Sequence, residues 1–199
     1  MAGYSVAKDL KQLEDIYVEE IKHCFVKNRP VIVVMSGLPG TGKSYFSEQL
    51  AATAELFVIS SDRIRKCLVK YPKYTSNEHY RVFASCHGLI ERLIQKNISV
   101  VFDATNLNKF AIQPLKKLST SLNCRMVIAL CVAPEPLVQS RLKDRVNGKD
   151  DYGSDADWDI YKMLKTKQTA ITEPYYEIDS SLDNSDAITA IQKFIMDEQ

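Results

Sequence analysis

The sequence predicts an α/β fold, with a parallel sheet covered by helices on both faces. Apolar, β-branched segments alternate along the chain with longer segments of helical periodicity. The segments 31–36, 98–103 and 125–132 are almost continuously apolar, which is typical of parallel strands buried on both faces. A glycine-rich loop follows the first of these segments and leads into a helical pattern. The 199 residues are enough for one domain with a sizeable core.

The order of the expected elements follows from this periodicity. The first helix, 6–24, has apolar residues at steps of three and four, so 1–29 is expected as an amphipathic helix packed on a domain of residues 30–199. Binding of a partner or of a second copy is the alternative role of this helix. Pro114 predicts a kink or a late start in the helix 109–121. Strands are expected at 31–36, 56–60, 98–103, 125–132 and 175–178, and further helices at 43–54, after 62, and at 77–96, 134–148, 155–170 and 186–196.

Composition limits the classes of function. The formal net charge of +1 gives no whole-chain electrostatic reason for nucleic-acid binding, although a local basic groove stays open. Five cysteines without CxxC spacing indicate free thiols in a reducing compartment. The first ten residues lack the apolar core of a signal peptide, and no apolar run reaches bilayer-spanning length. We therefore expect a cytoplasmic protein that has no membrane partner and is a monomer or homodimer.

The segment GLPGTGKS fits the pattern G-x-x-x-x-G-K-[ST] of a phosphate-binding P-loop. Its glycines allow backbone turns that converge N–H groups on phosphate oxygens, and the following helix points its positive dipole end at the same place. Lys43 would reach the β- and γ-phosphates of ATP, and the Ser44 hydroxyl would bind Mg²⁺. The nucleotide-binding residues expected here are Gly37, Leu38, Pro39, Gly40, Thr41, Gly42, Lys43, Ser44 and the adjoining Tyr45.

Polar residues follow the second and third strands, where a parallel sheet places its ligands. Asp62 is the candidate base that orients a hydroxyl and accepts its proton, and the alternative is that Asp62 or Ser61 only caps the next helix. Asp103 follows an apolar strand and could hold Mg²⁺ together with Ser44, or could serve a turn. The last expected site residues of this group, Thr105 and Asn106, either bind the acceptor or fix the turn.

Three arginines are candidates for binding anionic groups. Arg65 could clamp an anion on the acceptor, or could form a solvated surface pair with Arg63. Arg141 and Arg145 lie four residues apart, hence on one helix face. As part of a lid over about 134–170, which includes the acidic segment 148–157, they would approach the phosphates and stabilise transition-state charge. A merely charged helix face is the alternative.

The motifs at 37–44, 60–65 (SSDRIR), 100–108 (VVFDATNLN) and 141–145 (RLKDR) together resemble the P-loop kinases that include polynucleotide 5′-hydroxyl kinase domains. The segment 153–157 (GSDAD) is similar to one in related bacterial AAA-type ATP-binding kinases. This resemblance implies a three-layer P-loop NTPase fold of the adenylate-kinase type with a lid and strand order 2-3-1-4-5. It also implies roles for site residues: Asp62 as base, Arg65 as contact to an acceptor phosphate, Thr105 and Asn106 beside the acceptor, and Arg145 with Arg141 near the γ-phosphate.

The favoured function is therefore an ATP- and Mg²⁺-dependent kinase that transfers the γ-phosphate to a hydroxyl acceptor. A small molecule is the favoured acceptor, because the acidic lid would repel a nucleic-acid backbone. A polynucleotide 5′-hydroxyl is the first alternative. A nucleotide-dependent switch or ATPase that acts on a partner is the second alternative.

Overall fold

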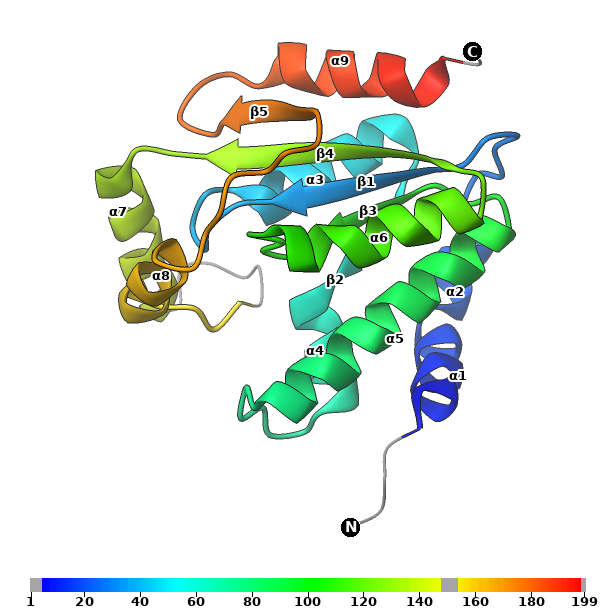
Figure 1. Ribbon diagram of the computed structural model, residues 1–199, viewed down its shortest axis with the longest axis horizontal. Helices are drawn as coiled ribbons and strands as arrows, with labels where there is room; N and C mark the ends of the chain where they lie inside the picture. Colours follow the sequence, from blue (N-terminus) through cyan, green and yellow to red (C-terminus); the bar gives the residue numbers. More distant parts are fainter. Residues whose placement is uncertain (1–4, 148–153, 198–199) are drawn as a thin grey trace.

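The computed structural model describes residues 5–147 and 154–197. Within them, five strands form one parallel sheet in the order β2-β3-β1-β4-β5 (Figure 1). The central strand β1 pairs with both neighbours, Ile32 opposite Val100 in β3 and Val33 opposite Val127 in β4. The predicted fold class and strand order are confirmed. The strands are β1 (Val31–Ser36), β2 (Phe57–Ser60), β3 (Val100–Asp103), β4 (Arg125–Val132) and β5 (Tyr175–Asp179).

Helices cover both faces of this sheet, and Figure 1 shows α5 and α6 on the side away from α9. Alternate side chains of β1 serve the two layers, because successive residues of a strand point to opposite faces. Ile32 and Val34 belong to the core beneath one set of helices, and Val33 and Met35 to the core beneath the other. The first set is α1 (Val6–Ile16), α4 (Ser61–Leu68), α5 (Ser76–Gln95) and α6 (Lys109–Ser121), and the second is α3 (Lys43–Ala54) and α9 (Ser185–Met196).

The N-terminal segment differs from the single helix expected over 6–24. It consists of α1 and a short α2 (Val18–Lys22), which meet at Tyr17. The Tyr17 side chain is buried and its ring packs edge-on against Phe57, with 5.6 Å between ring centroids. Leu10 and Leu13 of α1 enter the same core. Tertiary packing of an aromatic ring therefore lies at the point where the helix is interrupted.

Two helices lie beyond the carboxyl ends of the strands, α7 (Glu135–Val146) and α8 (Trp158–Lys165) (Figure 1). They pack on the P-loop through a small apolar cluster that includes Leu38, Val138 and Tyr161. Asp157 caps α8 by accepting a hydrogen bond from the Ile160 N–H, so this helix is shorter at both ends than the expected 155–170. The segment 148–153 of the expected lid lies outside the described residues.

Two further expectations concern the helices. α6 runs without interruption from Lys109 to Ser121 with Pro114 inside it, so the predicted late start is wrong. Across residues 5–147 and 154–197, we find no helix that combines the length and the apolar character needed to cross a bilayer.

Candidate functional site

The glycine-rich loop joins β1 to α3 and lies against residues at the ends of both neighbouring strands, β3 and β4. Gly37 has φ +140° and donates its N–H to the Thr105 carbonyl at 3.0 Å. A Cβ at Gly37 would lie 2.4 Å from the Cys131 carbonyl oxygen, so only glycine fits this close approach. Gly42 precedes α3 with φ +87°. The loop thereby brings its backbone to the N-terminus of α3, an arrangement that suits anions.

Lys43 is buried and turned back onto the loop. Its Nζ donates to the Leu38 carbonyl at 2.8 Å, and the Thr41 hydroxyl donates to the same oxygen at 2.8 Å. Burial lowers the pKa of Lys43, whereas the nearby Asp103 carboxylate acts in the opposite direction. The ammonium is thus a desolvated cation at the mouth of the loop, where it would interact strongly with a phosphate.

The Ser44 and Asp103 side chains link α3 directly to β3. The Ser44 hydroxyl donates to Asp103 Oδ2 at 2.7 Å. Burial raises the pKa of Asp103, against the effects of Lys43 and Ser44. Hydroxyl and carboxylate oxygens are ligands that Mg²⁺ prefers, so this pair fits the ion. In the described ranges, no three His, Cys, Asp or Glu side chains cluster as metal ligands, so a cation here needs further oxygen ligands such as phosphate.

Asp62 lies in the first turn of α4, at the end of β2. Ser60 caps this helix by accepting a hydrogen bond from the Arg63 N–H at 3.4 Å, so the alternative interpretation, in which Asp62 or Ser61 only caps the helix, is wrong. The negative charge of Asp62 contributes to raising the pKa values of both Asp103 and Tyr74. Asp62 is half-buried, and its charge acts both on Asp103 of β3 and on Tyr74 of the segment before α5.

The two polar residues after β3 have different surroundings. Asn106 is 1% exposed, has φ +43° and donates its side-chain amide to the Met35 carbonyl at 2.8 Å, while its own carbonyl accepts from the Ser36 hydroxyl at 2.9 Å. These contacts fix the turn, which is the second of the two interpretations of Asn106. Thr105 is half-buried and its carbonyl holds Gly37. Its hydroxyl stays a candidate for the acceptor side.

The two arginines of α7, Arg141 and Arg145, were predicted to lie near the P-loop. Arg141 donates to the Ser180 hydroxyl at 2.7 Å, to the Ser180 carbonyl at 2.9 Å and to the Gly40 carbonyl at 3.3 Å. It therefore braces the P-loop against the turn after β5. The positive charge of Arg145 contributes to lowering the pKa values of both Lys43 and Asp103. Tyr45, on the first turn of α3, is 56% exposed.

Arg65 is buried and paired with an acidic side chain, unlike a residue of a solvated surface pair. Its side chain is 5% exposed and its Nη1 lies 2.5 Å from Glu78 Oε1, so the expected solvated pair with Arg63 is wrong for Arg65. Arg63 is exposed and lies 3.7 Å from Glu20. Glu78 belongs to α5 and was not among the expected site residues. The pattern Thr75-x-x-Glu78, in which Thr75 caps the helix, is the local signal that could have identified it.

Comparison with protein families matches residues 32–165 to a family described as an AAA domain. The chain belongs to this AAA domain family. Comparison with curated protein sequences found no match. The matched range contains the P-loop, Asp62, Asp103 and both arginines of α7.

Several solved structures share the fold of this AAA domain protein. Kti12 from Chaetomium thermophilum, in complex with ADP-AlF3, has a TM-score of 0.69 at 15% identity and covers 83% of this chain and 100% of its own. The Mycobacterium tuberculosis APS kinase CysC, in complex with AMPPNP and APS, has a TM-score of 0.63 at 12% identity and covers 86% and 100%. A gluconokinase from Sinorhizobium meliloti has a TM-score of 0.57 at 16% identity and covers 85% and 95%. The fold is therefore that of P-loop kinases.

Proposed function

We propose that this AAA domain protein is an ATP-dependent kinase that transfers the γ-phosphate to a hydroxyl group of a small molecule. The observation that supports this most is the convergence of Lys43, Asp62 and Asp103 at the carboxyl edge of three adjacent strands. Lys43 provides a cation for the phosphates, Asp62 a base and Asp103 an oxygen ligand. We further propose a cytoplasmic location, which suits five cysteines that are all free thiols.

The reaction needs only positioning and charge stabilisation from the protein. The P-loop N–H groups and Lys43 would hold the triphosphate. Asp62 would orient the acceptor hydroxyl and accept its proton as the oxygen bonds to the γ-phosphorus and the bond from the γ-phosphorus to the ADP oxygen breaks. Arg145 would stabilise the charge on the transferring group, with Arg141 keeping the loop in place. Thr105, and Asn106 through the turn that it fixes, would bound the acceptor side.

Ser44 and Asp103 would hold Mg²⁺, which when bound neutralises phosphate charge. In the structure these two side chains share a hydrogen bond, so the pair is already oriented for a common ligand. Burial of Asp103 excludes water from one side of that position.

The test is incubation of the purified protein with Mg²⁺, γ-labelled ATP and a panel of small alcohols and 5′-hydroxyl oligonucleotides. Labelled phosphoester on a small alcohol supports the proposal. Labelled oligonucleotide alone would instead identify a polynucleotide kinase, the finer resemblance that the motifs imply.

A nucleotide-dependent switch acting on a partner is the second candidate. One observation favours it: the segment from α1 to β1 exposes several large apolar side chains, which is typical of a protein-binding surface. These side chains are Ile16, Val18, Phe25 and Val26. Release of inorganic phosphate without any acceptor, and with no labelled product on the panel, would favour this candidate.

A further inference from the structure

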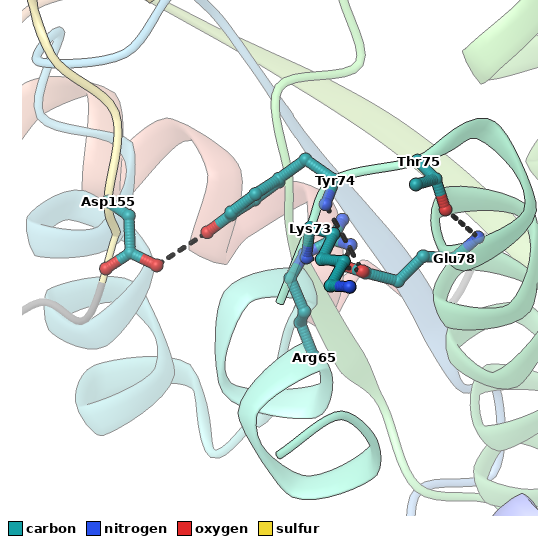
Figure 2. Close-up of polar contacts among 6 residues, drawn as sticks. All are labelled: Arg65, Lys73, Tyr74, Thr75, Glu78 and Asp155. Atoms are coloured by element: carbon teal, nitrogen blue, oxygen red, sulfur yellow. Dashed lines mark hydrogen bonds and ion pairs between the residues drawn. The ribbon is translucent and has the colours of Figure 1, made fainter. Parts of the chain in front are cut away.

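On the acceptor side of the site, the Arg65 guanidinium is already paired with the Glu78 carboxylate. Glu78 accepts three hydrogen bonds, from Arg65 Nη1 at 2.5 Å to Oε1 and from the Lys73 and Tyr74 N–H groups at 2.8 and 3.2 Å to Oε2 (Figure 2). Burial acts to raise the pKa of Glu78, but the Lys73 N–H and the Arg65 guanidinium outweigh it and hold the pKa below its usual value. The carboxylate therefore stays ionised opposite the arginine at neutral pH.

The remaining surface of Arg65 is covered. The Tyr74 ring lies against the guanidinium, with 4.6 Å from Cζ to the ring centroid. Arg65 is 4% exposed, and its Nε is buried with no hydrogen-bond partner. An anion on the acceptor would have to displace Glu78 or the tyrosine ring to reach this charge. Displacing Glu78 would take away its charged partner and leave only its bonds from the Lys73 and Tyr74 N–H groups, which is unfavourable for a carboxylate whose side chain is 10% exposed.

Tyr74 is itself fixed in place. Its backbone has φ +53°, which is unfavourable for a residue with a Cβ, and the hydrogen bond to Glu78 stabilises it there. Its hydroxyl donates to Asp155 Oδ2 at 2.6 Å, across to the segment before α8 (Figure 2). Burial first, and then Asp155 and Asp62, raise the pKa of Tyr74, so the phenol stays a neutral donor. The ring therefore forms a wall between Arg65 and the segment before α8.

Two carboxylates, Asp62 and Asp155, lie beside this wall. Asp155 is exposed and bonded to a neutral phenol, and Asp62 is the proposed base. Lys73 contributes its backbone N–H to Glu78 while its side chain is exposed to solvent. The two carboxylates repel an anionic ligand, and the exposed Lys73 ammonium is largely screened by solvent.

We infer that the acceptor is an alcohol without phosphate groups, uncharged or amine-bearing. Glu78 and Tyr74 set this specificity because they occupy the Arg65 guanidinium and keep it from binding an anion on the acceptor. The inference rests on the proposed kinase function and narrows it. It differs from the role that the motif resemblance implies for Arg65, which is contact with an acceptor phosphate. Glu78 and Tyr74 act through Arg65 and are therefore positioning residues.

The first test measures whether the arginine can bind an anion. Inorganic phosphate is titrated into protein saturated with Mg²⁺ and AMPPNP, by calorimetry, for the wild type and Glu78→Gln. Glu14→Gln is the matched control, since it also removes one carboxylate from an arginine pair, with Arg92, but on α1. We expect Glu78→Gln to bind phosphate at least about tenfold more tightly than the wild type, because a guanidinium and a phosphate form a charge-assisted pair. Glu14→Gln should match the wild type.

Two results of this titration would overturn the inference: phosphate binding by the wild type as tight as that of Glu78→Gln, or no gain in Glu78→Gln. If Glu78→Gln shows no cooperative thermal unfolding, Tyr74→Ala uncovers the guanidinium instead and is read in the same way, with Tyr175→Ala as its control on β5.

The second test uses the wild type alone and acceptors in matched pairs, ribose against ribose 5-phosphate and adenosine against adenosine 3′-monophosphate. We expect the phosphate-free member of a pair to have a kcat/KM at least about tenfold higher, because like charges facing each other are costly. A preference for the phosphorylated member would overturn the inference and leave the kinase proposal standing. If no member of any pair is phosphorylated, the kinase proposal fails, and the phosphate titration still decides whether Arg65 is withheld.

Discussion

The loop at 37–44 and the loop at 69–75 bound the two halves of the site, and they are built differently. The first is held largely by contacts within the loop, such as the bond from the Lys43 ammonium to the Leu38 carbonyl, and by residues near the adjacent strands, with one further bond from Arg141 of α7 to the Gly40 carbonyl. The second is held by an ion pair 13 residues apart, Arg65 with Glu78, and by a bond 81 residues apart, Tyr74 with Asp155. The donor half is thus a local motif, whereas the acceptor half depends on which distant segments meet.

Because of this difference, the donor half indicates the type of reaction, whereas the acceptor half indicates the specificity for the acceptor. The triphosphate is the same chemical group in every ATP-dependent kinase, and a short loop at a helix N-terminus suffices to bind it. Acceptors differ from one kinase to another, and specificity for them comes from pairs of side chains that fold together. Substitutions in the donor half should therefore abolish transfer for every acceptor, whereas substitutions in the acceptor half should change which acceptor is used.

The largest effect is expected at the boundary of the two halves. Asp62→Asn keeps the shape of the side chain but removes the base, so kcat should fall by about 10²–10⁴-fold. Affinity for AMPPNP should stay near that of the wild type in calorimetry, because the P-loop is intact. Asp186→Asn is the control, since Asp186 also lies in the first turn of a helix but on α9, and it should leave kcat unchanged. Unchanged turnover in Asp62→Asn would remove this residue as the base.

A somewhat smaller effect is expected from the donor half alone. Lys43→Ala removes the buried cation from the P-loop, and kcat should fall by about 10²–10³-fold because transition-state charge loses a partner. The loss should be equal for every acceptor, which steady-state assays with two acceptors can measure. The exposed Lys193→Ala on α9 should behave like the wild type. A loss confined to one acceptor would contradict the assignment of Lys43 to the donor half.

The backbone of the donor half can be tested through stability. Gly37→Ala places a Cβ 2.4 Å from the Cys131 carbonyl at φ +140°, and overpacking of this kind costs about 1–3 kcal/mol before the backbone strain is added. Urea unfolding should show this decrease. At Gly88, within a helix, the atoms nearest to an added Cβ belong to the flexible side chain of Leu10, so Gly88→Ala should be less destabilising. Equal losses in the two variants would show that the loop tolerates the side chain.

The smallest effect concerns the acceptor half and depends on pH. The pKa of Glu78 is lowered below its ordinary value of 4.5 in the fold, so its ion pair stabilises the protein above that pH and is lost as the pH falls through the lowered value. Glu78→Gln should therefore be less stable than the wild type by about 1.5–3 kcal/mol at pH 7, a typical contribution of hydrogen bonds to a charged group. Thermal or urea unfolding at pH 7, 5, 4 and 3 measures the difference, which should shrink below pH 4.5. A difference independent of pH would show that the carboxylate charge contributes nothing.

Much of the donor half was predictable because its signals are local. The GLPGTGKS loop, its preceding apolar strand and the carboxylate at the end of β3 are all visible in the sequence, and the structure brings Ser44 to 2.7 Å from Asp103. The continuously apolar segments also predicted the parallel sheet, since strands covered on both faces are apolar throughout. The helix break at Tyr17 was not predictable, because periodicity continues through it and only packing on Phe57 marks the point.

For the acceptor half, the sequence by itself determined the residue types, an arginine three positions after an aspartate and an asparagine after β3. Only the tertiary structure decided what they bind. Arg65 is buried against Glu78, 13 residues away, and Asn106 is held by the Met35 carbonyl, 71 residues away. The physical reason is that a charged or polar group that loses water must find a partner, and the nearest partner in space is set by the fold rather than by distance along the chain.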